Sequence, residues 1–164
     1  MSSLNVTMRK RGILRSEYVL GDGPTEIGLL RTSGLFRRRC QLETPRERYV
    51  FSGDGRRTEV LGGQGAPIGE LRLGWTRLQG DLVRPGLPTV TWRRAGAWGL
   101  ECVFEDEAGG PIVALRPMGS WVRNGASVEV APEAAARPDL HLLIGLAFYR
   151  MVRQVAAATT GTEV

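Results

Sequence analysis

The last quarter of the chain has a different hydrophobic pattern from everything before it. The segment Leu140–Tyr149 contains a single polar side chain, His141, and at 100° per residue its ten positions cover all sides of a helix. A surface helix keeps a polar face, so we expect this helix to be enclosed for its first three turns. Arg150, Arg153 and Gln154 share one sector further along, which predicts that the helix then emerges from the core.

Upstream, short apolar runs alternate with Gly-rich turns about every ten residues, a spacing typical of an antiparallel barrel or sandwich. In the run 98–105 the apolar side chains occupy alternate positions, as in a strand with one buried face. The predicted strands are 13–20, 25–31, 35–42, 49–52, 58–61, 68–75, 89–94, 98–105, 112–116, 120–123 and 126–130. The Asn124-Gly125 pair indicates a type I′ hairpin between the last two.

These patterns predict a mainly β fold, a closed or nearly closed antiparallel barrel of about twelve strands around a hydrophobic C-terminal helix. A chain of 164 residues is long enough for one domain with a sizeable core. We expect a flexible basic N-terminus over 1–12, a single barrel domain over 13–158 with its central helix at 139–158, and a tail at 159–164. Asp139 is placed to cap the helix, and Gly145 predicts close approach of an enclosing strand.

An internal repeat accompanies the strands. Residues 27–31, 68–72 and 112–116 read IGLLR, IGELR and IVALR, and each copy follows a turn that contains Gly and Pro. The copies lie about forty residues apart. They indicate either one turn-and-strand unit used three times or the common hairpin pattern of any β-meander.

The net charge of +5 raises the question of an anionic partner. Among the 22 basic residues only Lys10 is a lysine, and the arginines are spread along the chain, as a genome-wide coding bias would also produce. The arginine doublets and triplets are the candidate ligand-binding residues, because on strands of one barrel they would converge on an anionic surface: Arg37, Arg39, Arg56, Arg57 and Arg93. Aromatic residues are too sparse between them to favour nucleic acid.

Catalytic and metal-binding patterns are missing from the sequence. The single histidine, His141, begins an apolar helix, and no Gly-x-Ser-x-Gly elbow accompanies it. Cys40 and Cys102 lie on apolar strand faces, which predicts buried reduced thiols and a reducing compartment. The acidic cluster at 101–107 lacks the order of a calcium loop. We therefore expect no catalytic residue, no metal ligand and no cofactor.

The ends of the chain bear on location. The segment 1–12 is polar and basic with no apolar stretch behind it, so we expect no signal peptide. The uninterrupted apolar run of the C-terminal helix is far shorter than the ~20 residues of a membrane span. The expected location is cytoplasmic, and a peripheral association with a membrane is compatible with it.

Taken together, the helix and the turns resemble those of the Tubby C-terminal-like superfamily, most closely its LURP-one-related and phospholipid scramblase branches. The resemblance covers Ile13–Val155: the steps at 21–28 and 65–69 look like its turn-and-strand entries, and Leu140–Val155 looks like its central helix. It implies a closed antiparallel barrel of about twelve strands around that helix.

The resemblance supports a prediction of the fold more than a prediction of any activity. Scramblases have an acidic calcium-associated segment near the helix, where this chain has only Glu129, Glu133 and Asp139, and the arginines of the helix interrupt membrane insertion. None of the arginines aligns with the phosphoinositide-binding residues of Tubby domains.

We therefore expect a non-enzymatic binding or scaffold domain of Tubby-like form that recognises an anionic lipid or a partner protein, with nucleic acid disfavoured. The alternative is a lipocalin-like barrel that binds a small molecule and has enzymatic activity. The position of the helix distinguishes them, because a helix inside the barrel takes the space that a ligand would need.

Overall fold

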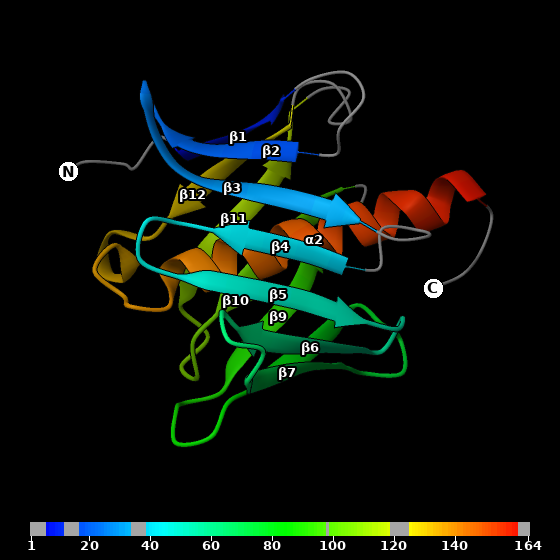
Figure 1. The fold of residues 1–164 in the computed structure, drawn as a ribbon. Helices are drawn as coiled ribbons and strands as arrows, with labels where there is room; N and C mark the ends of the chain where they lie inside the picture. The colour runs from blue at the N-terminus through cyan, green and yellow to red at the C-terminus, as the bar shows by residue number, and fades with distance from the viewer. Residues whose placement is uncertain (1–5, 12–16, 34–38, 98, 119–124, 161–164) are drawn as a thin grey trace.

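A computed structural model of the chain describes residues 6–11, 17–33, 39–97, 99–118 and 125–160 (Figure 1). The described part contains twelve strands, one short 3-10 helix and one long α-helix. They are β1 (Val6–Arg11), β2 (Glu17–Asp22), β3 (Thr25–Ser33), β4 (Arg39–Glu43), β5 (Arg48–Gly53), β6 (Arg57–Gly62), β7 (Pro67–Leu73), β8 (Gln79–Val83), β9 (Val90–Ala95), β10 (Glu101–Glu105), β11 (Pro111–Pro117), β12 (Ala126–Val130), η2 (Pro132–Ala134) and α2 (Leu140–Thr160).

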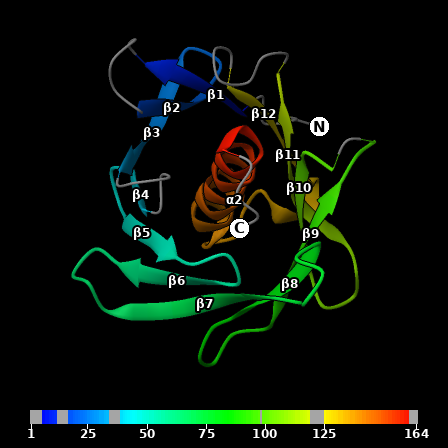
Figure 2. The ribbon, with the colours of Figure 1, turned by 90° about the vertical axis from the view of Figure 1, so that its right-hand side faces the viewer.

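Consecutive strands pair antiparallel from β1 to β12, and β1 also pairs with β12, so the strand order is that of a closed barrel. The β1–β12 pairing is the shortest, with the three residue pairs Val6↔Val128, Thr7↔Ser127 and Met8↔Ala126. Figure 2 shows α2 within the ring of strands, packed on β10 and β11 and, on its other side, on β4 and β5. The predicted mainly β antiparallel sheet with a C-terminal helix packed against it is confirmed. No helix in the described ranges has the length and apolar character needed to cross a membrane.

The first three turns of α2 are enclosed, as predicted. Leu143, Leu146 and Phe148 have no exposed surface. The Phe148 ring meets the ring of Tyr18 on β2 edge to face, with centroids 4.6 Å apart. A Cβ at Gly145 would lie 2.9 Å from Leu42 Cδ2 and 3.0 Å from Phe51 Cε2, so the glycine admits the side chains of β4 and β5.

The predicted exit of the helix from the core after its third turn is wrong. Arg150 and Arg153 are only 3% and 4% exposed, and Met151 and Val152 between them are buried as well. The strands surround the helix for longer than expected, so the polar sector that we assigned to solvent lies inside the barrel.

The predicted flexible N-terminus is also wrong over 6–11, which forms β1. The backbone of β1 is paired on both sides, with β2 and with β12, because Val6 and Met8 alternate with polar residues in a strand pattern that the basic composition obscured. Strand β8 was not predicted, since Gly80 and Asp81 are poor strand formers. The helix ends at Thr160 rather than 158.

Other sequence predictions fall outside the described residues. These are the strand at 120–123, the turn residue Asn124 and the candidate Arg37.

The internal repeat corresponds to a regular feature of the barrel. Its three copies lie in β3, β7 and β11, at every fourth strand. In each case the hairpin that enters the copy has a register shift, at Leu20/Gly21, Val60/Leu61 and Phe104/Glu105. We therefore describe the barrel as three four-stranded units, β1–β4, β5–β8 and β9–β12.

Candidate functional site at one rim of the barrel

The two ends of the barrel differ in how their charges are arranged. At one end α2 begins, and at the other it ends (Figure 1). We call the second end the C-terminal rim; its described connections are 54–56, 74–78, 96–97 and 99–100. The end where α2 begins is the N-terminal rim.

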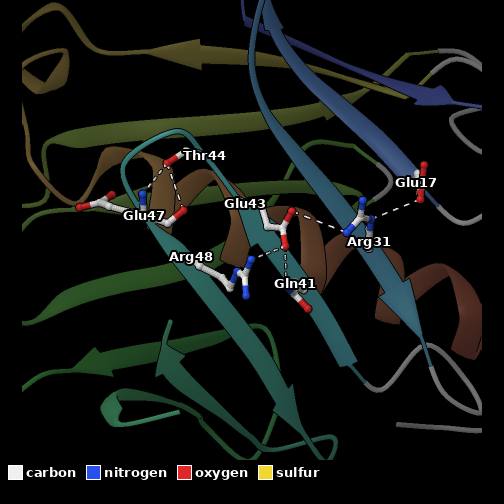
Figure 3. A network of polar contacts seen from close by, with 7 residues as sticks. All are labelled: Glu17, Arg31, Gln41, Glu43, Thr44, Glu47 and Arg48. Atoms are coloured by element: carbon white, nitrogen blue, oxygen red, sulfur yellow. Dashed lines mark hydrogen bonds and ion pairs between the residues drawn. The ribbon is translucent and has the colours of Figure 1, made fainter. Parts of the chain in front are cut away.

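Ion pairs cross the outer face of the first unit (Figure 3). Arg31 on β3 lies 3.2 Å from Glu17 on β2 and 3.6 Å from Glu43 on β4, and Glu43 also contacts Arg48 at 3.1 Å. Gln41 donates a hydrogen bond of 2.8 Å to the same carboxylate of Glu43. This arrangement gives the repeat arginine Arg31 two carboxylate partners within the sheet.

The third unit repeats the arrangement. Arg116 on β11 lies 3.4 Å from Glu101 on β10 and 3.2 Å from Glu129 on β12. Arg31 and Arg116 occupy the last position of the repeated sequence, so the ion pairs belong to the repeat itself. Such exposed pairs contribute at most about 1 kcal/mol each to stability. They do place two carboxylates beside each of the repeat arginines Arg31 and Arg116.

The middle unit departs from this pattern. Its repeat arginine, Arg72 on β7, stands opposite Arg57 on β6, at the position where the other units have glutamate. Both arginines share one carboxylate, since Glu70 lies 2.7 Å from Arg72 and 3.8 Å from Arg57. Their side chains are 62% and 72% exposed. In the described structure these two arginines therefore have one ion-pair partner between them, Glu70, while Asp81 on β8 stands opposite Arg72.

The structure brings some of the predicted arginines together. Arg39 begins β4, which pairs with β5, and Arg56 and Arg57 follow β5 at the same rim, all three exposed. The backbone N–H groups of Arg56 and Arg57 donate to Asp54 Oδ1 at 2.8 and 2.9 Å, which lowers the pKa of Asp54. Arg93 is separate: it lies three strands from β6, on β9, and pairs with Glu105 at 2.7 Å.

Sequence reasoning missed two exposed apolar residues in one turn at this rim. Trp75 and Leu78 in the β7–β8 turn are 85% and 53% exposed. The Leu73 N–H donates to the Arg56 carbonyl at 2.8 Å, which holds the turn beside Arg56. The sequence placed Trp75 at the end of a strand, although Gly74 before it was a signal for a turn. We call Arg56, Arg57, Arg72, Trp75, Arg77 and Leu78 the Trp75 patch.

Arg77 occupies an unfavourable backbone conformation within the patch. Its φ is 56°, in the left-handed region where glycine is favoured, and its N–H donates to the Gly74 carbonyl at 3.0 Å. A non-glycine residue costs about 1–2 kcal/mol in this region. Strain of this kind is often retained at functional positions.

A second polar group lies inside the barrel near the same rim. The Cζ atom of Arg150 is 5.3 Å from the ring centroid of Trp92, a cation–π contact worth about 2 kcal/mol when desolvated. Within the described residues, Arg150 Nε and Nη1 and Arg153 Nε have no hydrogen-bond partner, and neither guanidinium has an ion pair. Burial costs several kcal/mol for each such ion, so the cation–π contact alone does not offset it.

The surroundings of Arg150 also disfavour its charged form. Burial lowers the pKa of Arg150 to about 10, and the charges of Arg153 and Arg94 act in the same direction. Cys102 nearby is a free, buried thiol whose pKa burial raises to about 12, and Cys40 is likewise free and buried. Both thiols are as predicted, and neither is a reactive thiolate at neutral pH.

The N-terminal rim is organised differently. Arg84 Nη1 contacts Asp139 Oδ2 at 2.7 Å, and Arg137 contacts the same carboxylate at 2.8 and 2.9 Å. Burial by itself raises the pKa of Asp139, but the hydrogen bonds from Arg137 and Arg84 outweigh it and lower the pKa. The carboxylate of Asp139 therefore binds arginines instead of capping the helix as predicted.

A pocket of about 510 Å³ lies beside Arg137, one of the two arginines that contact Asp139. Its lining comes from the start of β3, the β4–β5 connection and the segment before α2, and includes Thr44, Arg46, Arg137 and His141. The only histidine of the sequence thus lies beside a pocket. Among the described residues, no group of three or more His, Cys, Asp and Glu side chains is arranged to hold a metal ion.

No protein-family model matches the chain, and no curated protein or solved structure matches it either.

Proposed function

We propose that this chain is a non-enzymatic binding domain of Tubby-like form that docks on an anionic membrane surface through the Trp75 patch. The observation that supports this most is the exposed Trp75 and Leu78 beside two arginines that share a single carboxylate. The arrangement of a barrel around an apolar helix supports the Tubby-like part of the proposal.

Each component of the patch has a known effect at a membrane. Tryptophan favours the headgroup region, where its ring is partly buried and its N–H stays wet. An arginine near an anionic surface contributes about 1 kcal/mol. Because Trp75 lies between arginines of the β5–β6 and β7–β8 connections, both effects act on the same face of the molecule.

The apolar contribution is tested by co-sedimentation with vesicles of phosphatidylserine and phosphatidylcholine. Trp75→Ser combined with Leu78→Ser is expected to weaken binding at least tenfold. The matched control is Leu87→Ser at the N-terminal rim, since Leu87 is 55% exposed and Leu78 is 53% exposed. Equal weakening by the control would show that the two rims do not differ in function.

The charge contribution is tested by Arg57→Glu, which gives the middle unit the glutamate that the other units have. Replacing a positive charge by a negative one changes the attraction by about 2 kcal/mol, or roughly thirtyfold in affinity. Replacing Arg39, Arg56 and Arg57 together by Ser is expected to cost about two orders of magnitude, with little change in stability.

Binding is expected to weaken as salt rises, because exposed charges are screened. Neutral vesicles and duplex DNA are the controls for ligand class. Failure to bind anionic vesicles at low salt would eliminate the proposal, and equal binding to DNA would reduce it to nonspecific charge.

The rival prediction, a small-molecule-binding barrel, now concerns the N-terminal rim. The helix α2 takes the central space that a lipocalin-like ligand would need, so this alternative is assigned to the pocket beside His141. Titration of that pocket with candidate ligands in a thermal-shift assay tests this alternative independently of vesicle binding.

A further inference from the structure

We infer that Arg150 and Arg153 form an internal binding site for a tetrahedral oxyanion, a phosphate group carried either by a soluble molecule or by a lipid headgroup. The inference goes beyond surface docking, because the two guanidinium groups lie inside the barrel and are separate from the Trp75 patch.

The first argument is the chemistry of the unpartnered groups. Arg150 Nε and Nη1 and Arg153 Nε are all donors, and none has a hydrogen-bond partner in the described structure. Their residues are at most 4% exposed. Buried polar groups are almost always hydrogen-bonded, and a cluster rich in donors calls for a ligand that mainly accepts. An oxyanion is such a ligand.

The second argument is charge. The basic groups that act on Arg150 are Arg153 and Arg94, and the groups that act in the opposite direction are the Cys102 thiol and the Tyr149 phenol rather than carboxylates. Asp54 is close enough to interact with Arg153, yet it forms no ion pair with it, and its Oδ1 accepts the N–H groups of the β5–β6 turn. An anion between the two guanidinium groups would supply the charge that this part of the barrel lacks.

The third argument is geometry. Positions three apart lie on the same side of a helix, so Arg150 and Arg153 project into one region between α2 and the sheet. The Arg150 Cζ atom lies over the Trp92 ring, and Nε and Nη1 of the same guanidinium have no partner in the described structure. A guanidinium edge binds phosphate in a bidentate manner.

The fourth argument is access. Gln154 and Val155, in the following turn, are partly exposed, so the cluster lies at the boundary between core and solvent at the C-terminal rim (Figure 2). Gln154 Nε2, a donor, and Gln154 Oε1, an acceptor, are unpartnered as well, although both atoms are shielded from solvent.

The test is thermal unfolding of the full chain in sodium chloride and in sodium phosphate at equal ionic strength. Phosphate at about 100 times its dissociation constant is expected to raise the melting temperature of the wild type by about 5–10 °C. Arg150→Met and Arg153→Met are expected to lose this shift. Arg48→Met is the control, because the Arg48 side chain is 55% exposed on the outside of the sheet and does not line the pocket; it should keep the shift.

The order of stabilities separates ligand binding from a structural role. In chloride, Arg150→Met is expected to be at least as stable as the wild type, because it removes an uncompensated buried charge. In phosphate the wild type should be the more stable. A loss of stability of equal size in both salts would show that Arg150 only packs on Trp92 and would overturn the inference. So would an unchanged phosphate shift in both Met variants.

Further arms identify the source of the phosphate. A shift with glycerol phosphate and inorganic phosphate indicates a soluble ligand, and a shift only with phosphatidic acid vesicles indicates a headgroup. The double variant Trp75→Ser, Leu78→Ser should weaken vesicle docking while keeping the shift with inorganic phosphate, so failure of one proposal is distinguishable from failure of the other. If Arg150→Met does not fold, Arg150→Lys and Arg153→Gln take its place: they should reduce the shift, and a full shift in both would overturn the inference. Absence of any shift in the wild type would overturn it directly.

Discussion

Replacing Asp139 by Asn should loosen the attachment of α2 to the barrel. Asp139 immediately precedes the helix, and its carboxylate receives Arg84 from the far end of β8 at 2.7 Å and Arg137 at 2.8 Å. The side chains of Arg84 and Asp139 are only 4% and 15% exposed. Because Asn carries no charge, the substitution leaves the Arg84 guanidinium buried without a counter-ion.

The magnitude follows from the burial of the pair. Removing one partner of a buried ion pair costs about 3–5 kcal/mol. Asp139 is partly exposed and Asn keeps one acceptor oxygen, so we expect a loss of about 2–3 kcal/mol in the free energy of unfolding. Against a total of about 5–15 kcal/mol this is a large fraction. For a domain of this size it lowers the melting temperature by roughly 5–10 °C.

Urea and thermal unfolding measure the loss. Arg137→Gln is the matched control, because Arg137 contacts the same carboxylate but its side chain is 30% exposed, and it should cost less than about 1 kcal/mol. If Asp139→Asn cost no more than Arg137→Gln, burial of the Arg84 pair would not be the source of its stability.

The pH dependence gives an independent check. The pKa of Asp139 is lowered in the folded protein, so its contribution is present above the ordinary value of about 3.9 and is lost as pH falls through the folded value. The stability curves of wild type and Asp139→Asn should therefore converge in acid. Curves that stay parallel down to pH 2 would refute the assignment.

Three further substitutions test other parts of the structure. Leu143→Asp or Ile144→Asp should prevent folding, because both positions are at most 1% exposed and an unpaired buried charge costs several kcal/mol; a soluble variant with the wild-type melting temperature would contradict the enclosed helix. Gly145→Val should lower the free energy of unfolding by about 1–3 kcal/mol in urea titrations, since even its Cβ would crowd Leu42 and Phe51. Arg77→Gly should raise stability by about 1 kcal/mol and weaken binding to anionic vesicles about fivefold, a pairing of effects that a purely structural Arg77 would not give.

Hydrophobic periodicity predicted the parts of the fold that depend on burial. The all-round apolar pattern of 140–149 identified an enclosed helix, and Gly145 within it indicated close approach of an enclosing strand, which in the structure is made by side chains of β4 and β5. The repeat at 27–31, 68–72 and 112–116 located three strands at equivalent places in the barrel. The repeat leucines Leu30, Leu71 and Leu115 are fully buried, and the apolar residues of 140–149 are buried as well. In the core, sequence pattern and position are most closely linked.

The candidate site was harder to predict because it depends on distances between strands. A helical wheel places Arg150 and Arg153 in one polar sector, but only the structure shows that this sector faces Trp92 on β9. Likewise, the doublet at 56–57 and the one at 93–94 look alike in sequence. The structure leaves Arg57 sharing Glu70 with Arg72, while Arg93 has Glu105 to itself. Such differences arise from strand order and register, which a single sequence does not specify.

The distribution of charge over the three units explains why one rim stands apart. Glu17 and Glu101 occupy corresponding places in the first and third units, and each neutralises the repeat arginine of the adjacent strand. Arg57 occupies that place in the middle unit, and the turn that follows β7 exposes Trp75. Neither change is needed for the fold, since the other two units form the same pairing without it. A unit that gives up its neutralising glutamate and exposes a tryptophan at the same rim is better explained by binding than by stability.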